Sequence, residues 1–260
     1  MFETIRVEVD ARGVAGLWLN RPEKHNVMSG RMMAELNAAA LDLGADPAVR
    51  VVVLQSGGES FCAGGDLGWM QAQVAGDAAS RRVEARKLAG ALFTLNTMPK
   101  PMIGRIHGNA FGGGVGMACV CDIAIAAEGA KFGLTETKLG LIPATIGPYV
   151  IARMGEANAR RVMMSSRVFD AAEAGRLGVV ARVVPLADLD AAIEAEVAPY
   201  LDCAPGAVAA AKRLARRLGP VIDDALIDET IEALVARWET DEAAEGIAAF
   251  FAKRKPVWRG

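Results

Sequence analysis

The 260-residue chain has few histidines, cysteines and aromatic side chains. It contains 2 histidines and 4 cysteines, and Phe, Trp and Tyr together make up 5% of the sequence. Only His25 and His107 could supply imidazole ligands. The cysteines lack the paired CxxC spacing that is typical of a zinc site. We therefore expect no bound metal, and we expect free, mostly buried thiols at Cys62, Cys119, Cys121 and Cys203.

A surplus of one charge and a long apolar run are also missing. Lys and Arg total 29 against 31 Asp and Glu, so the formal net charge is −2. This balance gives no global electrostatic reason to expect nucleic acid as a partner. No segment approaches the roughly 18 consecutive apolar residues of a transmembrane helix, and the N-terminus does not resemble an export signal. We expect a cytoplasmic protein with neither a membrane nor a nucleic acid as partner.

The first part of the chain carries strand and helix patterns in turn. Apolar residues alternate over 5–9 and resume over 14–19, which predicts a β-hairpin. Ser29 is placed to cap a helix that ends before Pro47. The continuous apolar run at 51–54 predicts a strand that is covered on both faces of its sheet.

The same strand–helix order then repeats and predicts an α/β fold. A helix is expected over 81–97, and strands over 102–106, 122–126 and 179–184. No strand pattern follows, so we divide the chain into an α/β core at 1–186 and a helical region at 187–260. Breaks are expected at Pro205 and Gly219-Pro220. The last helix should bury one stripe, either against its own chain or against another subunit: Ile227, Ile231, Leu234, Val235 and Trp238.

Two glycine-rich turns, at 61–67 and 109–116, each precede a predicted helix. Glycine permits close backbone approach, and the first turn of a helix presents unpaired N–H groups at a positive dipole end. These features suit an oxyanion hole, although glycine clusters also serve as simple tight turns. Neither turn has the context of a G-x-G-x-x-G dinucleotide motif.

One carboxylate, Glu136, follows in a glycine-punctuated segment and is the best acid/base candidate. The residues alone also allow a simpler interpretation, in which Glu136 forms a surface ion pair with Lys131 or Lys138.

These stretches together resemble the enoyl-CoA hydratase/isomerase (crotonase) superfamily over nearly the whole chain. The motifs that carry the resemblance are N-R-P-E-K-H-N at 20–26, F-C-A-G-G-D-L at 61–67, K-P at 100–101, the triple glycine at 112–114, C-D-I at 121–123, F-G-x-x-E at 132–136 and G-x-x-P at 140–143.

The resemblance implies a core built as a spiral of ββα repeats, a C-terminal helical region that mediates oligomerisation, and a homotrimer or homohexamer. It implies an acyl-CoA substrate, with no cofactor beyond the coenzyme A of that substrate. The backbone amides of Gly65 and Gly113 would hold the thioester oxygen, and Glu136 would move a proton.

The resemblance also suggests residues that bind the substrate. Ala63 and Leu67 would line the passage for the acyl and pantetheine groups. Asp66, beside them, is expected mainly to cap the following helix. The coenzyme end would lie along Lys24, His25 and Val27.

Gly116 departs from the family pattern, because typical hydratases carry a first glutamate there that shares a water molecule with the second. Its absence leaves three readings open: hydration with one acid, a Δ3,Δ2 double-bond shift with one base, or other enolate chemistry. A non-catalytic acyl-CoA-binding relative is a further alternative. The missing side chain should leave room for a branched or carboxylated acyl group. The segments 66–70 and 133–139 resemble the methylglutaconyl-CoA hydratase branch, which favours hydration.

Overall fold

The computed structural model describes residues 2–260, so Met1, the first residue of the predicted core, lies outside it. The chain opens with the predicted hairpin, in which β1 (Ile5–Val9) pairs antiparallel with β2 (Val14–Leu19). At its turn Gly13 has φ +82°, and a Cβ there would lie 2.3 Å from the Ala48 carbonyl oxygen. The hairpin therefore depends on glycine at this position.

The main sheet has the strand order β1-β2-β3-β5-β7-β10. From β2 onward its strands are parallel, and β3 at its centre is almost fully buried. This burial explains the continuous apolar run of the sequence. The added strands are β3 (Val51–Ser56), β5 (Met102–Ile106), β7 (Ile123–Ala127) and β10 (Arg182–Val184).

A second sheet has the order β4-β6-β8-β9. Three successive units each give one strand to each sheet: β3 and β4, β5 and β6, and β7 and β8. The α/β class and the ββα-repeat spiral are thereby confirmed. The strands of the second sheet are β4 (Ser60–Cys62), β6 (Asn109–Phe111), β8 (Lys131–Gly133) and β9 (Val168–Asp170).

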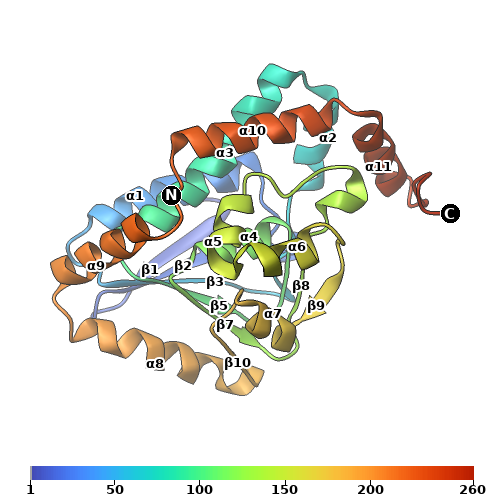
Figure 1. Ribbon diagram of the computed structural model, residues 1–260. Helices are drawn as coiled ribbons and strands as arrows, with labels where there is room; N and C mark the ends of the chain where they lie inside the picture. Colours follow the sequence, from blue (N-terminus) through green and yellow to red (C-terminus); the bar gives the residue numbers. More distant parts are fainter. Residues whose placement is uncertain (1) are drawn as a thin grey trace.

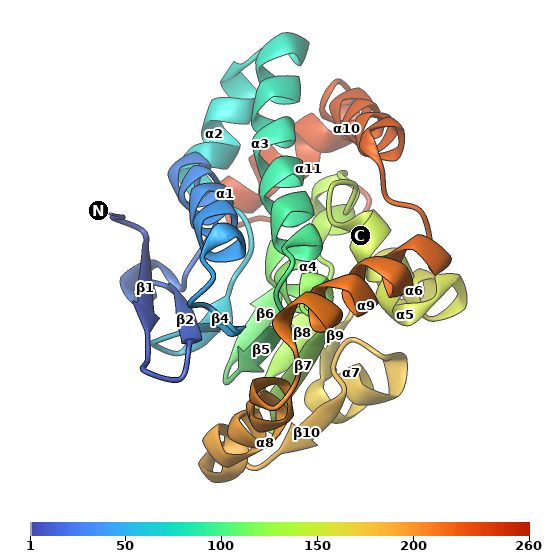
Figure 2. The same cartoon turned by 90° about the vertical axis from the view of Figure 1, so that its left-hand side faces the viewer.

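Helices cover both faces of the main sheet (Figures 1 and 2). On one face α1 (Gly30–Ala45) lies beside α3 (Ala78–Thr97), and the Ser29 hydroxyl caps α1 as predicted by accepting from the Met32 amide. On the other face α8 (Leu189–Leu201) packs against β3, β5 and β7.

Shorter helices connect the strands. They are α2 (Leu67–Ala75), α4 (Gly113–Val120), α5 (Gly147–Met154), α6 (Glu156–Met163) and α7 (Ala171–Leu177). Three single 3-10 turns span Pro22–Lys24, Glu136–Leu139 and Leu186–Asp188.

The chain ends in α9 (Pro205–Leu218), α10 (Asp224–Trp238) and α11 (Asp241–Phe251). The predicted apolar stripe belongs to α10, which crosses α3 in Figure 1, and it packs against its own chain. The expectation that this was the last helix is wrong. Thr240 caps α11, a short helix that follows the helix predicted to be the last.

The described residues include no helix with the length and apolarity needed to cross a bilayer. The four cysteines are all free, and three of them are buried, with Cys203 exposed.

Candidate active site

The first glycine turn leaves the amide of Gly65 free. Its neighbours are bonded to Met28 on both sides: the Met28 amide donates to the Gly64 carbonyl at 2.8 Å, and the Asp66 amide donates to the Met28 carbonyl at 3.0 Å. Gly64 has φ +99°, which a side chain would disfavour. The Gly65 N–H has no hydrogen-bond acceptor within residues 2–260.

Asp66 closes this turn by capping α2. Its Oδ1 accepts from the amides of Gly68 and Trp69 at 2.8 and 3.3 Å, and its Oδ2 accepts from the Arg21 guanidinium at 3.0 Å. Although partial burial opposes ionisation, these hydrogen bonds lower the pKa of the Asp66 carboxyl. Asp66 therefore has the predicted structural contact, and its side chain is held away from the substrate space.

The second turn brings Gly113 to the first position of α4, where a helix has no internal acceptor for the amide. Gly112, just before it, has φ +50° and donates its amide to the Gly133 carbonyl at 2.8 Å. A Cβ on Gly112 would lie 3.9 Å from the Gly64 Cα. The two amide turns therefore pack directly against each other.

Glu136 follows β8 and begins its own 3-10 turn beside the second amide turn. Its Oε1 would lie 3.1 Å from a Cβ on Gly112. Its Oε2 is buried and has no hydrogen-bond partner in the described part of the chain. Burial raises the pKa of the Glu136 carboxyl to about 7. The alternative of a surface ion pair is wrong, since Lys131 and Lys138 are exposed whereas Glu136 Oε2 is buried without a partner among the described residues.

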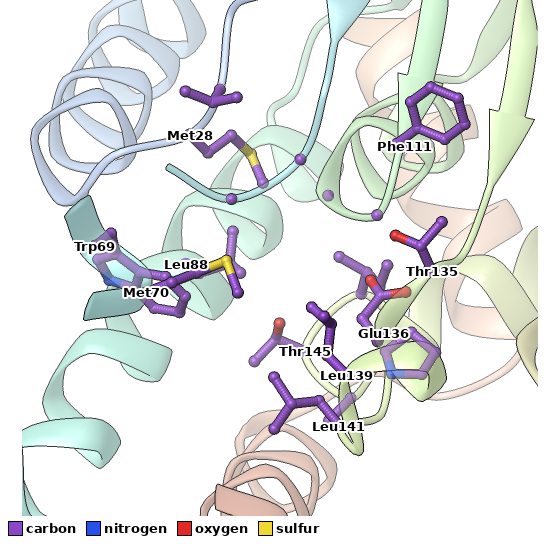
Figure 3. A pocket seen from close by; sticks show the side chains of 18 of the residues that line it. Met28, Trp69, Met70, Leu88, Phe111, Thr135, Glu136, Leu139, Leu141 and Thr145 are labelled. Carbon is purple, nitrogen blue, oxygen red and sulfur yellow. The ribbon is translucent and has the colours of Figure 1, made fainter. Parts of the chain in front are cut away.

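A cavity of about 590 Å³ joins these groups. In Figure 3 the Glu136 carboxylate faces this cavity, whose walls are mainly apolar. The Trp69 indole N–H is directed away to Glu84 Oε2 at 3.1 Å, which leaves its ring as an apolar surface. The remaining lining includes Met28, Met70, Leu88, Leu139 and Leu141.

The cavity brings together six of the predicted residues: Val27, Ala63, Gly65, Leu67, Gly113 and Glu136. Lys24 is exposed at the end of a 3-10 turn, and the His25 ring lies 3.3 Å from the Ser60 hydroxyl. Neither lines this cavity. Their role at the coenzyme end stays a prediction.

Gly116 does not line the cavity, and the expected room beside it is filled. A Cβ at this position would lie 2.4 Å from Ile146 Cγ2 and 2.9 Å from Ile146 Cβ. Ile146 is 3% exposed and lines the cavity itself. The expectation of free space for a branched or carboxylated group is therefore wrong, because a neighbouring apolar side chain occupies it.

Several residues that line the cavity were not among the predicted site residues. Thr145 and Ile146 precede α5, while Leu234, Trp238 and Phe250 come from α10 and α11. The α10 stripe was recognised as buried, but no pattern in the sequence indicates that its end reaches the Glu136 cavity.

Comparison with known proteins identifies the family of this chain. The model of the enoyl-CoA hydratase/isomerase family matches residues 10–260. A crotonyl-CoA hydratase of Syntrophomonas wolfei is 33% identical, with 98% of this chain and 97% of the relative covered.

Two solved structures superpose on this chain over almost its full length. An enoyl-CoA hydratase from Shewanella pealeana superposes with a TM-score of 0.82 at 37% identity, covering 99% of this chain and 97% of the other. Pseudomonas aeruginosa AtuE superposes with a TM-score of 0.80 at 39% identity, covering 99% and 100%. With its paired amide turns and buried carboxyl, the chain belongs to the enoyl-CoA hydratase/isomerase family of enzymes.

Proposed function

We propose that this enzyme catalyses the reversible addition of water to a 2-enoyl-CoA, with Glu136 as its acid/base. The observation that carries the proposal is the position of the Glu136 carboxyl, buried beside Gly112 where two amide turns meet. Hydratases among the similar proteins support the same reaction class.

The amides of Gly65 and Gly113 would stabilise the negative charge that develops on the thioester oxygen. Neither N–H has an acceptor in the described part of the chain, and Gly113 adds the positive end of the α4 dipole. Donors that are already oriented before the reaction need no rearrangement as the charge forms. The expected product of this step is an enolate.

Glu136 would carry one proton through the whole reaction. The carboxylate accepts a proton from water as the water oxygen bonds to C3, and the electron pair of the double bond moves toward the thioester oxygen. The enolate then takes that proton from Glu136 at C2. A pKa near 7 suits both steps, because the group must accept and release a proton at neutral pH.

The direct test is Glu136→Gln, assayed with crotonyl-CoA by the absorbance of the conjugated thioester. General acid/base catalysis typically contributes about 100- to 10,000-fold, so we expect at least a 100-fold loss of kcat. Glu128→Gln, which changes an exposed acid, is the matched control and should stay within about twofold. Activity in Glu136→Gln equal to that of the control would refute the assignment.

The cavity lining supports an uncharged acyl chain over a carboxylated one. Glu136 is the only charged residue among those that line it. A second carboxylate in this apolar space would repel the ionised form of Glu136. We therefore expect crotonyl-CoA or a longer uncharged enoyl-CoA to have a higher kcat/KM than 3-methylglutaconyl-CoA; the reverse order would restore the branch suggested by the sequence.

The single carboxylate also favours one alternative, a Δ3,Δ2-enoyl-CoA isomerase. One base can move a proton between two carbons without an added water. Turnover of a 3-enoyl-CoA with no hydration of its 2-enoyl product would support that alternative. Binding of every thioester without turnover would instead support a non-catalytic relative.

Assembly as a homotrimer or homohexamer is also part of the proposal. Exposed apolar side chains on the C-terminal region support it, including Leu218 at 79% and Val221 at 62% exposure. Light scattering after gel filtration should give three or six times the monomer mass of 27.3 kDa. A monomer at assay concentration would contradict it. A cytoplasmic location and independence from added cofactors stay predictions.

A further inference from the structure

Few polar groups face the cavity besides Glu136. The Trp69 N–H is already bonded to Glu84. The remaining side-chain candidates are the hydroxyls of Thr135 and Thr145. Thr145 is the more buried of these, at 6% exposure, and it lines the cavity. In Figure 3 Thr145 points into the cavity that the Glu136 carboxylate also faces.

The loop around Thr145 is held on both sides. The Ala144 amide donates to the Ile142 carbonyl at 2.8 Å, and the Gly147 amide donates to the Ala144 carbonyl at 2.9 Å. Ile146 fills the space that Gly116 leaves open. The backbone on both sides of Thr145 is therefore held in place.

A water molecule in an apolar cavity needs two to four polar partners to be held in place. Glu136 supplies one such partner. Thr135 lies next to Glu136, but its Cγ2 packs toward Gly133 and its side chain is only partly buried. Thr145 is therefore the better placed second partner on the described part of the cavity wall.

We propose that Thr145 is a positioning residue that holds the attacking water for Glu136. This inference rests on the proposed hydration. One water hydrogen goes to the Glu136 carboxylate as the oxygen bonds to C3, while the other hydrogen donates to Thr145 Oγ1 throughout. The proton on Glu136 then moves to C2, so Thr145 neither gains nor loses a proton.

Two reactions of the same site separate this role from a general effect on folding. Hydration of crotonyl-CoA needs the positioned water. Exchange of the C2 protons of butyryl-CoA in D₂O needs the amide turns and Glu136, but no water addition. A group that only holds water should affect the first reaction and leave the second unchanged.

The test compares Thr145→Val, which removes the hydroxyl at nearly constant shape, with Thr145→Ser, which retains it. We expect Thr145→Val to lose about tenfold or more in hydration kcat, as for loss of a buried hydrogen bond, with C2 exchange within about twofold. Thr145→Ser should recover most of the hydration. Thr97→Val is the matched control, because the Thr97 hydroxyl bonds to the Phe93 carbonyl within α3 and does not line the cavity. It should change neither reaction.

Equal losses of hydration and exchange in Thr145→Val, or no loss of hydration, would overturn the role of Thr145. If Thr145→Val does not fold, Thr145→Ala gives the same comparison. Wild-type enzyme that exchanges C2 protons but hydrates no enoyl-CoA would overturn the proposed function itself, and the role of Thr145 with it.

Discussion

The two walls of the active-site cavity are built in different ways. The wall of amide turns consists of backbone from two short segments, each a strand followed by glycine and a helix start. The opposite wall consists of side chains from Leu139 to Ile146 and from α10 and α11, which are about one hundred residues further along the chain. The first wall fixes where negative charge can develop on the substrate. The second determines how far the Glu136 carboxyl is shielded from water and which acyl groups the cavity can hold.

The wall of amide turns is tested most strongly by Gly114→Ala, which should force the two turns apart. A Cβ on Gly114 would lie 2.3 Å from the Cys62 carbonyl oxygen, a backbone atom that cannot move without its turn. Loss of one oxyanion-hole donor typically costs about 100- to 1000-fold, and we expect a loss of kcat in this range. The assay is crotonyl-CoA hydration, with circular dichroism to confirm folding.

Gly129→Ala is the matched control for that substitution, because a Cβ there meets no atom within 4 Å. Full activity in folded Gly114→Ala would show that close packing of the turns is unnecessary for catalysis.

The apolar surroundings that the second wall gives Glu136 should affect the pH dependence of hydration. Burial raises the pKa of Glu136 to about 7, and only the carboxylate can accept a proton from water. The value of kcat/KM should therefore fall about tenfold per pH unit below pH 7 and level off above it. A kcat/KM profile that stays flat down to pH 5 would contradict a raised pKa of the Glu136 carboxyl.

The two walls of the cavity differ in how much of their structure could be predicted from the sequence. The strands of the main sheet, the glycine turns and the Ser29 and Asp66 caps follow from local patterns of nearby residues, whereas the short strands of the second sheet were not predicted. The filling of the Gly116 position by Ile146 depends on packing between segments thirty residues apart. The contributions of Leu234 and Trp238 to the cavity depend on how α10 crosses the core, which periodicity does not determine.

The packing of Ile146 can be tested by restoring an acid at position 116. Gly116→Glu alone should clash with Ile146 and lower stability by about 1–3 kcal/mol, as overpacked cores do. Combining it with Ile146→Ala should recover most of that stability. We also expect hydration in the double variant to exceed that in Gly116→Glu by about tenfold, because a second acid then has space.

Thermal and urea unfolding measure the stability part of that comparison, and crotonyl-CoA turnover measures the rest. If Gly116→Glu is as stable as wild type, position 116 is not filled by Ile146 in solution.

A last prediction concerns the free energy of unfolding. The folded-state pKa of Glu136 is about 7 against an ordinary 4.5, so the folded state binds the proton more tightly than the unfolded state. This carboxyl therefore opposes folding increasingly as pH rises from about 4.5 to 7. Glu136→Gln should be more stable than wild type above pH 7, by up to about 3 kcal/mol, and the difference should vanish near pH 4.

Urea unfolding of both proteins across this pH range provides the measurement. A stability difference that is constant with pH would mean that the Glu136 pKa is not raised in the folded state.

In the proposed mechanism both amide turns and Glu136 converge on one thioester. A crystal structure with bound 3-hydroxybutyryl-CoA would show whether they do. The thioester oxygen should lie about 3 Å from the amide nitrogens of both Gly65 and Gly113, with the Glu136 carboxylate beside C2. A thioester oxygen bound away from either amide, or a Glu136 carboxylate turned away from C2, would rule out the proposed mechanism.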